Sequence, residues 1–178
     1  MGRSMISKRN LGALAVMMAG LAASGPAAAH PVPDSQFDLT VTADGVDGVL
    51  SIPLSELALV VDVRDIGATS PVADYLAAHI VATSVDDGAV WGLAVTALEL
   101  GEGQYDHGRY DLLTAHVHLT APEGTAEPFD LGYTAVVERV VTHHVNVTLT
   151  TPDGAAAPLG EVEYAPKDGT VTPIPVRW

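Results

Sequence analysis

The strongest constraint on the fold is the segment Arg109–Thr120, which alternates strictly between apolar and polar residues from Leu113 onward. From Leu113 to Leu119 every second position is leucine, alanine or valine, and threonine and histidine fill the positions between them. Successive side chains of a β-strand point to opposite faces of a sheet. The pattern therefore predicts a strand with one buried and one exposed face.

Comparable segments recur along the chain, separated by turn sequences rich in Asp, Gly and Pro. Strands are predicted at residues 37–42, 49–53, 90–100, 109–120, 128–137, 139–150, 159–164 and 171–176. Residues 101–108 are predicted to form a loop, and residues 54–63 fit either a short helix or a buried strand. We predict an all-β fold, an antiparallel immunoglobulin-like β-sandwich of about seven to nine strands with one short helix.

The helix is predicted between Ser70 and Ile80, where the period of two is lost. Ser70 can cap the first turn, and Pro71 suits the first helical position. Val72 and Leu76 then lie on one face, so a helix of two to three turns is expected to pack on the sandwich.

Residues 1–29 have the features of a secretory signal peptide. Three basic residues precede the apolar segment Leu11–Ala23, which is shorter than the roughly 20 residues that span a bilayer. Ala27 and Ala29 occupy the small-residue positions before a cleavage site. Cleavage after Ala29 is expected to leave a mature protein that begins with His30.

Residues 30–178 are predicted to form a single exported domain, periplasmic, extracellular or held at the cell surface, with no membrane span in the mature chain. Removing the leader leaves 5 basic and 22 acidic residues, a net charge of −17. Such a surface repels nucleic acid and keeps a secreted domain in solution. The sequence has no cysteine, so a metal site must use His, Asp, Glu, backbone groups or the N-terminus.

The N-terminal His30 is the first candidate ligand. Its amine and its ring Nδ1 can close a chelate on one ion. With one or two further imidazoles this makes a nitrogen-rich site that favours Cu(II), then Ni(II) or Zn(II). A transition metal, copper or nickel, is therefore the expected cofactor.

Other histidines could supply those imidazoles. His116 and His118 share a face of their predicted strand, about 7 Å apart, and can bind one ion together. His143 and His144 are adjacent and face opposite sides, with His143 on the apolar face. His79 ends the predicted helix, where an imidazole suits the helix dipole.

No hydrolase, P-loop or dinucleotide-binding motif occurs in the sequence, so we expect a protein that is not an enzyme. Two alternatives stay open. One is a non-catalytic structural or protein-interaction domain with incidental histidines. The other is a copper-dependent oxidase with an N-terminal histidine brace, to which the low aromatic content of 5% gives little support.

Five segments in order resemble the exported N-terminal domain of HupE/UreJ-type proteins. These segments are Ala29–Ser35, Pro53–Leu57, Tyr75–Ile80, Leu113–Pro122 and Val140–His144. The resemblance runs from about Ala29 to Leu149, and it rests on the series of motifs in order.

The resemblance implies a domain of hydrogenase or urease accessory proteins, which include metal permeases for nickel or cobalt. Their transmembrane helices are absent from this sequence. For this chain the resemblance therefore implies a domain for metal binding or delivery, with a metal ion and a membrane permease as partners. The histidines at matching motif positions are His30, His79, His116 and His143. His118 and His144 stand where the family pattern has Arg or Lys, and they rank lower on this ground.

Overall fold

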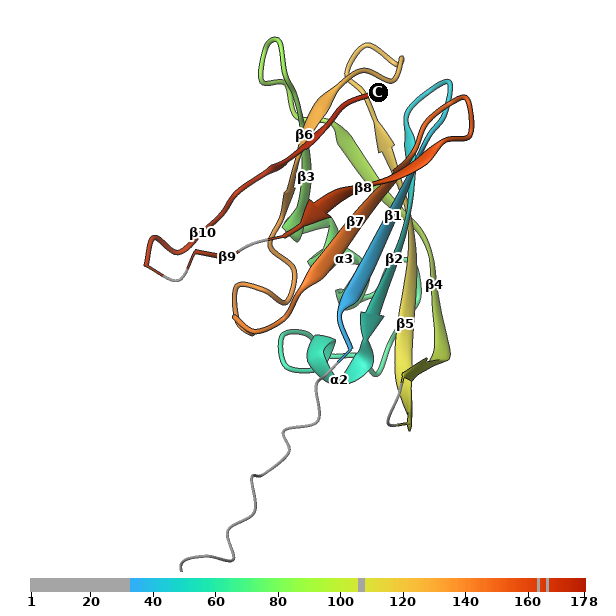
Figure 1. The fold of residues 1–178 in the computed structure, drawn as a ribbon. Helices are drawn as coiled ribbons and strands as arrows, with labels where there is room; N and C mark the ends of the chain where they lie inside the picture. Colours follow the sequence, from blue (N-terminus) through green and yellow to red (C-terminus); the bar gives the residue numbers. More distant parts are fainter. Residues whose placement is uncertain (1–32, 106–107, 163, 166) are drawn as a thin grey trace, which may run out of the picture. The chain divides into compact units, whose positions relative to one another are not determined.

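The computed structural model describes residues 33–105, 108–162, 164–165 and 167–178. Its strands form three sheets of six, three and two strands (Figure 1). Within this part of the chain, no helix is long and apolar enough to cross a bilayer.

The six-stranded sheet has the order β4 (Gly92–Tyr105), β5 (Gly108–Thr120), β2 (Val46–Pro53), β1 (Ser35–Val41), β7 (Val145–Thr150) and β8 (Ala156–Glu161). The three-stranded sheet has the order β11 (Ile174–Val176), β6 (Phe129–Tyr133) and β3 (Ile80–Ser84). The third sheet pairs β10 (Thr170–Val171) with β9 (Tyr164–Ala165), and the helices among the described residues are α2 (Leu54–Leu57) and α3 (Pro71–His79).

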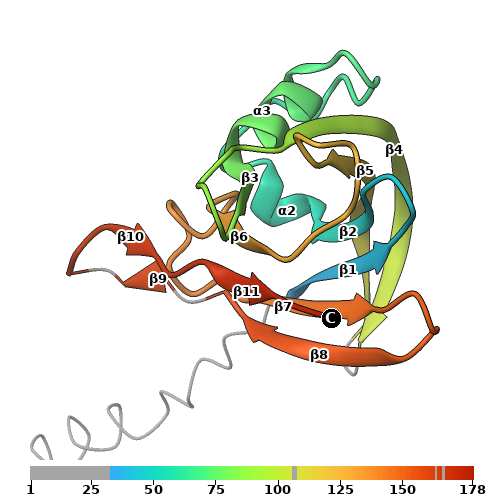
Figure 2. The same cartoon turned by 90° about the horizontal axis from the view of Figure 1, so that it is seen from above.

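The two larger sheets pack face to face, which confirms the predicted all-β sandwich. Figure 2 shows the six-stranded sheet curving around one side, with β3, β6 and β11 on its inner side. The ring of Phe37 on β1 lies 6.1 Å from that of Tyr133 on β6, and both side chains are completely buried. The described part contains eleven strands, more than predicted. Several of them have only two to five residues, which is too short for an apolar–polar alternation to be recognised in the sequence.

Strand β1 lies inside the six-stranded sheet, between β2 and β7. It pairs with β2 as an antiparallel hairpin, closed by a turn in which the Thr42 N–H donates to the Gly45 carbonyl at 2.9 Å. On its other side, β1 pairs with β7 in parallel, with Ser35 opposite Val145. This parallel pair departs from the expected antiparallel arrangement.

The predicted helix is confirmed as α3. The Ser70 Oγ accepts a hydrogen bond from the Ala73 N–H at 3.4 Å, and Pro71 is the first helical residue. Val72 and Leu76 are completely buried, as their shared face predicts. Residues 54–63 adopt the helical alternative only over α2 and continue as a turn and irregular chain.

Several predicted boundaries are wrong. The loop predicted at 101–108 is largely strand, because β4 runs to Tyr105 and β5 starts at Gly108. The strand predicted at 139–150 starts only at Val145, so residues 139–144 are turns and unpaired chain.

The strand predicted at 128–137 ends at Tyr133. Beyond it, Val136 adopts φ +66°, a left-handed conformation that is rare for a β-branched residue. The hydroxyl of Tyr75 accepts a hydrogen bond from the Val136 N–H at 2.9 Å. The completely buried Val136 side chain and this bond hold the turn in place.

Gly48 on β2 allows the Phe37 ring to lie close to the sheet. A Cβ at Gly48 would lie 2.6 Å from Phe37 Cε2 and 2.7 Å from Val117 Cγ2. We expect Gly48→Ala to lower the free energy of unfolding by about 1–3 kcal/mol, because two buried side chains must shift to admit one methyl group. Urea denaturation followed by circular dichroism measures this loss. Gly101→Ala, at a position with open space, serves as the matched control, and an equal loss in both variants would contradict the overpacking account.

Candidate functional site

The histidines of the described residues lie at three places: His79 at the end of α3, His116 and His118 on β5, and His143 with His144 before β7. Within residues 33–105, 108–162, 164–165 and 167–178, no three His, Asp or Glu side chains form a group that could hold a metal ion. His30, the first ligand expected from the sequence, lies outside the described residues. The remaining candidates are therefore described one by one.

His79 is engaged at both ring nitrogens. Its Nδ1 donates to the Tyr75 carbonyl at 2.8 Å, and its Nε2 lies 3.1 Å from Glu138 Oε1. The His79 ring also stacks on that of Tyr75, with 4.1 Å between ring centroids. These contacts tie the end of α3 to the turn after β6, which is a structural role.

His116 and His118 share the outer face of β5, as the alternation predicts, but their rings lean toward different strands. His118 Nδ1 lies 2.7 Å from Asp47 Oδ1 on β2, and a Cβ at Gly45 would lie 3.1 Å from His118 Nε2. His116 Nε2 lies 4.0 Å from Glu99 Oε1 on β4. The structure therefore does not bring the two imidazoles together on one ion.

His143 is buried at the start of β1. Its side chain is only 2% exposed, and its Nε2 lies 2.8 Å from the Ser35 Oγ. Its Nδ1 lies 3.9 Å from Glu56 Oε2 on α2. Burial lowers the pKa of His143 from 6.5 to about 4, so the ring is neutral at pH 7.

Ser35, His143 and Glu56 follow one another in space in the order of a catalytic triad, which consists of a serine nucleophile, its histidine base and an orienting acid. Several observations argue for a structural role. Ser35 is completely buried, and a base with a pKa of about 4 is poorly matched to proton transfer near neutral pH. Glu56 Oε2 has no hydrogen-bond partner within the described residues, and burial raises the pKa of this carboxyl group. The cluster joins β1, α2 and the turn before β7.

His144 is the exposed member of the pair. Its Nδ1 is hydrogen-bonded to the carboxylate of Glu161 at the end of β8, and about half of its side chain is exposed. This hydrogen bond raises the pKa of His144, so a proton competes with any ligand of the ring. His144 borders a cavity of about 230 Å³ that is lined by Val141, His143, His144, Glu161, Val162 and Tyr164.

The first strand begins beside this cavity. The Ser35 N–H donates to the His144 carbonyl at 2.9 Å, and β1 continues from there in register with β7. His30 precedes Ser35 by five residues. The described part of β1 thus begins next to His144.

Sequence reasoning ranked His144 low and did not identify Glu161. The family pattern placed Arg or Lys at position 144, and Glu161 has no histidine near it in the sequence. Their contact depends on the pairing of β7 with β8, where Asn146 lies opposite Glu161. Because the two residues are far apart in the sequence, their contact could not be predicted from it.

No family model and no curated protein matches this chain. The HupE/UreJ resemblance therefore stays a prediction from the motifs quoted above.

Proposed function

We propose that this chain is an exported domain that binds Cu(II) or Ni(II) and serves in metal homeostasis or delivery, with a membrane permease as its partner. In this proposal the ion is held by the amine and ring of a mature N-terminal His30 and by the ring of His144. Binding is the function, and no catalytic step is assigned.

The observation that carries the proposal is the exposed ring of His144. About half of its side chain is exposed, and it borders a cavity of about 230 Å³. An imidazole in this position is accessible to an ion from solvent, and imidazole nitrogen is a ligand that suits copper and nickel.

The second support is the contact between His144 and Glu161. Metal-binding histidines commonly donate their other ring N–H to a carboxylate, which fixes the ring and makes the ligand nitrogen more basic. Here Nδ1 faces Glu161, so Nε2 is the nitrogen left for an ion.

Two of the histidines at matching family positions are less available. Both ring nitrogens of His79 face oxygen atoms, and the ring of His143 is enclosed between Ser35 and Glu56. His116 is more exposed, but it lies on β5, with β2 and β1 between its strand and β7. We therefore propose His144, together with His30, as a ligand.

Isothermal titration of the mature protein with Cu(II) and with Ni(II) tests the proposal. We expect one site, and we expect Glu161→Gln to weaken it roughly 10- to 100-fold, the usual effect of removing a partner of a ligating histidine. His144→Ala and a protein with one alanine added before His30 should each weaken it at least as much. Affinity should rise with pH toward the amine pKa of about 8, because the ion displaces a proton.

His116→Ala is the matched control, since it removes an imidazole far from the proposed site, and its affinity should equal that of the unaltered protein. Equal affinity with and without the added alanine would remove His30 from the site. If neither metal binds and neither raises the melting temperature, the alternative of a structural domain with incidental histidines holds.

A further inference from the structure

We propose that the cavity between α2 and the end of the β4–β5 hairpin binds a small organic ammonium ion, with Asp111 facing the charge and the apolar lining facing its hydrocarbon part. The cavity has a volume of about 410 Å³ and is lined by Leu54, Ser55, Ala58, Val63, Tyr110 and Asp111. Nothing in the proposed metal function uses these residues.

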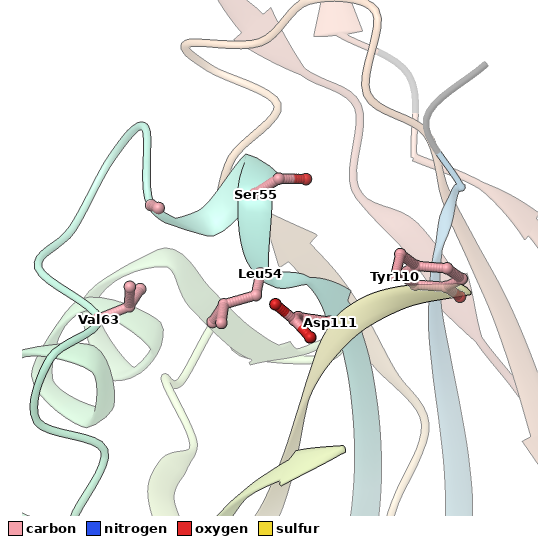
Figure 3. Close-up of a pocket in the computed structure, with 6 residues that line it drawn as sticks. Leu54, Ser55, Val63, Tyr110 and Asp111 are labelled. Atoms are coloured by element: carbon pink, nitrogen blue, oxygen red, sulfur yellow. The ribbon is translucent and has the colours of Figure 1, made fainter. Parts of the chain in front are cut away.

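The lining combines an apolar surface with one acid. Leu54, Ala58 and Val63 supply the apolar part, and in the view of Figure 3 the Asp111 side chain lies between those of Leu54 and Tyr110. Sites for small molecules are mostly apolar, have volumes of roughly 300–1,000 Å³ and contain a few polar groups that orient the ligand. This cavity falls within that range.

Asp111 keeps its charge available. The nearest base along the strand, Arg109, forms an ion pair across the hairpin with Glu102 at 3.0 Å. For Asp111 itself, the described residues provide neither a hydrogen bond nor an ion pair to its carboxylate. An unpaired carboxylate at the edge of an apolar hollow favours a cation that also carries apolar surface.

Tyr110 is held in place as part of the wall. Its ring lies directly over Gly103 on β4, where a Cβ would overlap the ring. Adjacent residues of a strand point to opposite faces, so the Tyr110 ring points away from Asp111 and only borders the cavity. The charge that faces the ligand is therefore that of Asp111.

The net charge of the chain and the single acid of the lining favour a cation over an anion or a neutral ligand. A net charge of −14 disfavours an anion, and a neutral alcohol would use the apolar lining but not Asp111. An alkylammonium ion satisfies both parts of the lining.

Titration of the full chain with hexyltrimethylammonium chloride, followed by NMR chemical shifts, tests this inference. We expect saturable binding in the millimolar range or tighter, with the largest shifts at Leu54, Tyr110 and Asp111. Hexanol and hexanoate, which have the same chain length, should bind at least fivefold more weakly. Asp111→Asn should weaken the ammonium ion roughly fivefold and leave hexanol unchanged, because it removes only the charge.

Two further variants complete the design. Ala58→Phe fills the cavity from an exposed position and should abolish binding of all three probes, while Glu123→Gln removes an equal charge from a distant turn and should leave binding unchanged. The inference is overturned if binding is not saturable, if hexanol binds as tightly as the ammonium ion, or if Glu123→Gln weakens binding as much as Asp111→Asn. Circular dichroism of each variant confirms that the fold is kept.

Discussion

The Phe37→Ala variant is expected to lose about 3–5 kcal/mol of unfolding free energy, the usual range for truncating a buried aromatic side chain. Phe37 is completely buried on β1, in the middle of the six-stranded sheet. It also contacts Tyr133 of the opposite sheet, so its removal leaves a cavity between the two layers. Urea denaturation followed by circular dichroism measures the loss.

The close approach of Phe37 to Gly48 provides an internal control. A methyl group at Gly48 is costly because the Phe37 ring occupies its space, and truncating that ring vacates the space. Phe37→Ala combined with Gly48→Ala should therefore lose less than the two single losses added together, by about 0.5–3 kcal/mol. Strict additivity would show that the two residues do not compete for the same volume.

The second large effect is a loss of stability in acid that depends on His143. The pKa of this ring falls from 6.5 to about 4 on folding, so between these values the unfolded chain binds more protons than the folded chain. Stability contributed by His143 is therefore complete above pH 6.5 and declines as the pH falls toward 4. The full difference is about 3 kcal/mol, since each pKa unit corresponds to about 1.4 kcal/mol.

The charged groups around His143 modify this slope. Asp34 favours its protonation and His144 opposes it. Burial raises the pKa of Glu56, so the folded chain binds the extra proton there, and this contribution has the opposite sign.

The variant His143→Gln separates the contribution of this histidine to the pH dependence from that of the other groups. It keeps a hydrogen-bonding group beside Ser35 and cannot titrate, so its stability should fall less than that of the unaltered protein between pH 7 and pH 4. Denaturant midpoints measured at half-unit steps of pH provide the comparison. Parallel curves for the two proteins would assign the acid sensitivity to other groups.

Local patterns were sufficient for much of the fold. The alternation in residues 109–120 places Leu113 and Leu119 in the core and His116 outside, as the structure confirms. Ser70 and Pro71 correctly mark the start of α3 because capping depends on a few adjacent residues. Such features depend only on residues that are close together in the sequence.

Features that depend on distant partners could not be predicted in this way. Residues 139–144 carry strand-like sequence, yet they form turns because the Val140 carbonyl accepts from the His143 N–H and the His143 ring is drawn into a pocket with Ser35. The hairpin of β4 and β5 extends across glycines that suggested a loop, since pairing with the neighbouring strand compensates for their poor strand propensity. The same limit hides the contact of His144 with Glu161, which needs the register of β7 and β8.

The parallel pairing of β1 with β7 means that the first strand of the sheet cannot be completed until a strand near the end of the chain is available. In the six-stranded sheet, the neighbours of β1 are β2, which follows at once, and β7, whose Val145 lies opposite Ser35. A chain shortened before Val145 would present β1 as an open edge, with free N–H and C=O groups that invite association with another chain. Contacts at such a separation form slowly, so we expect the sandwich to close late, once the chain from Val145 onward is present.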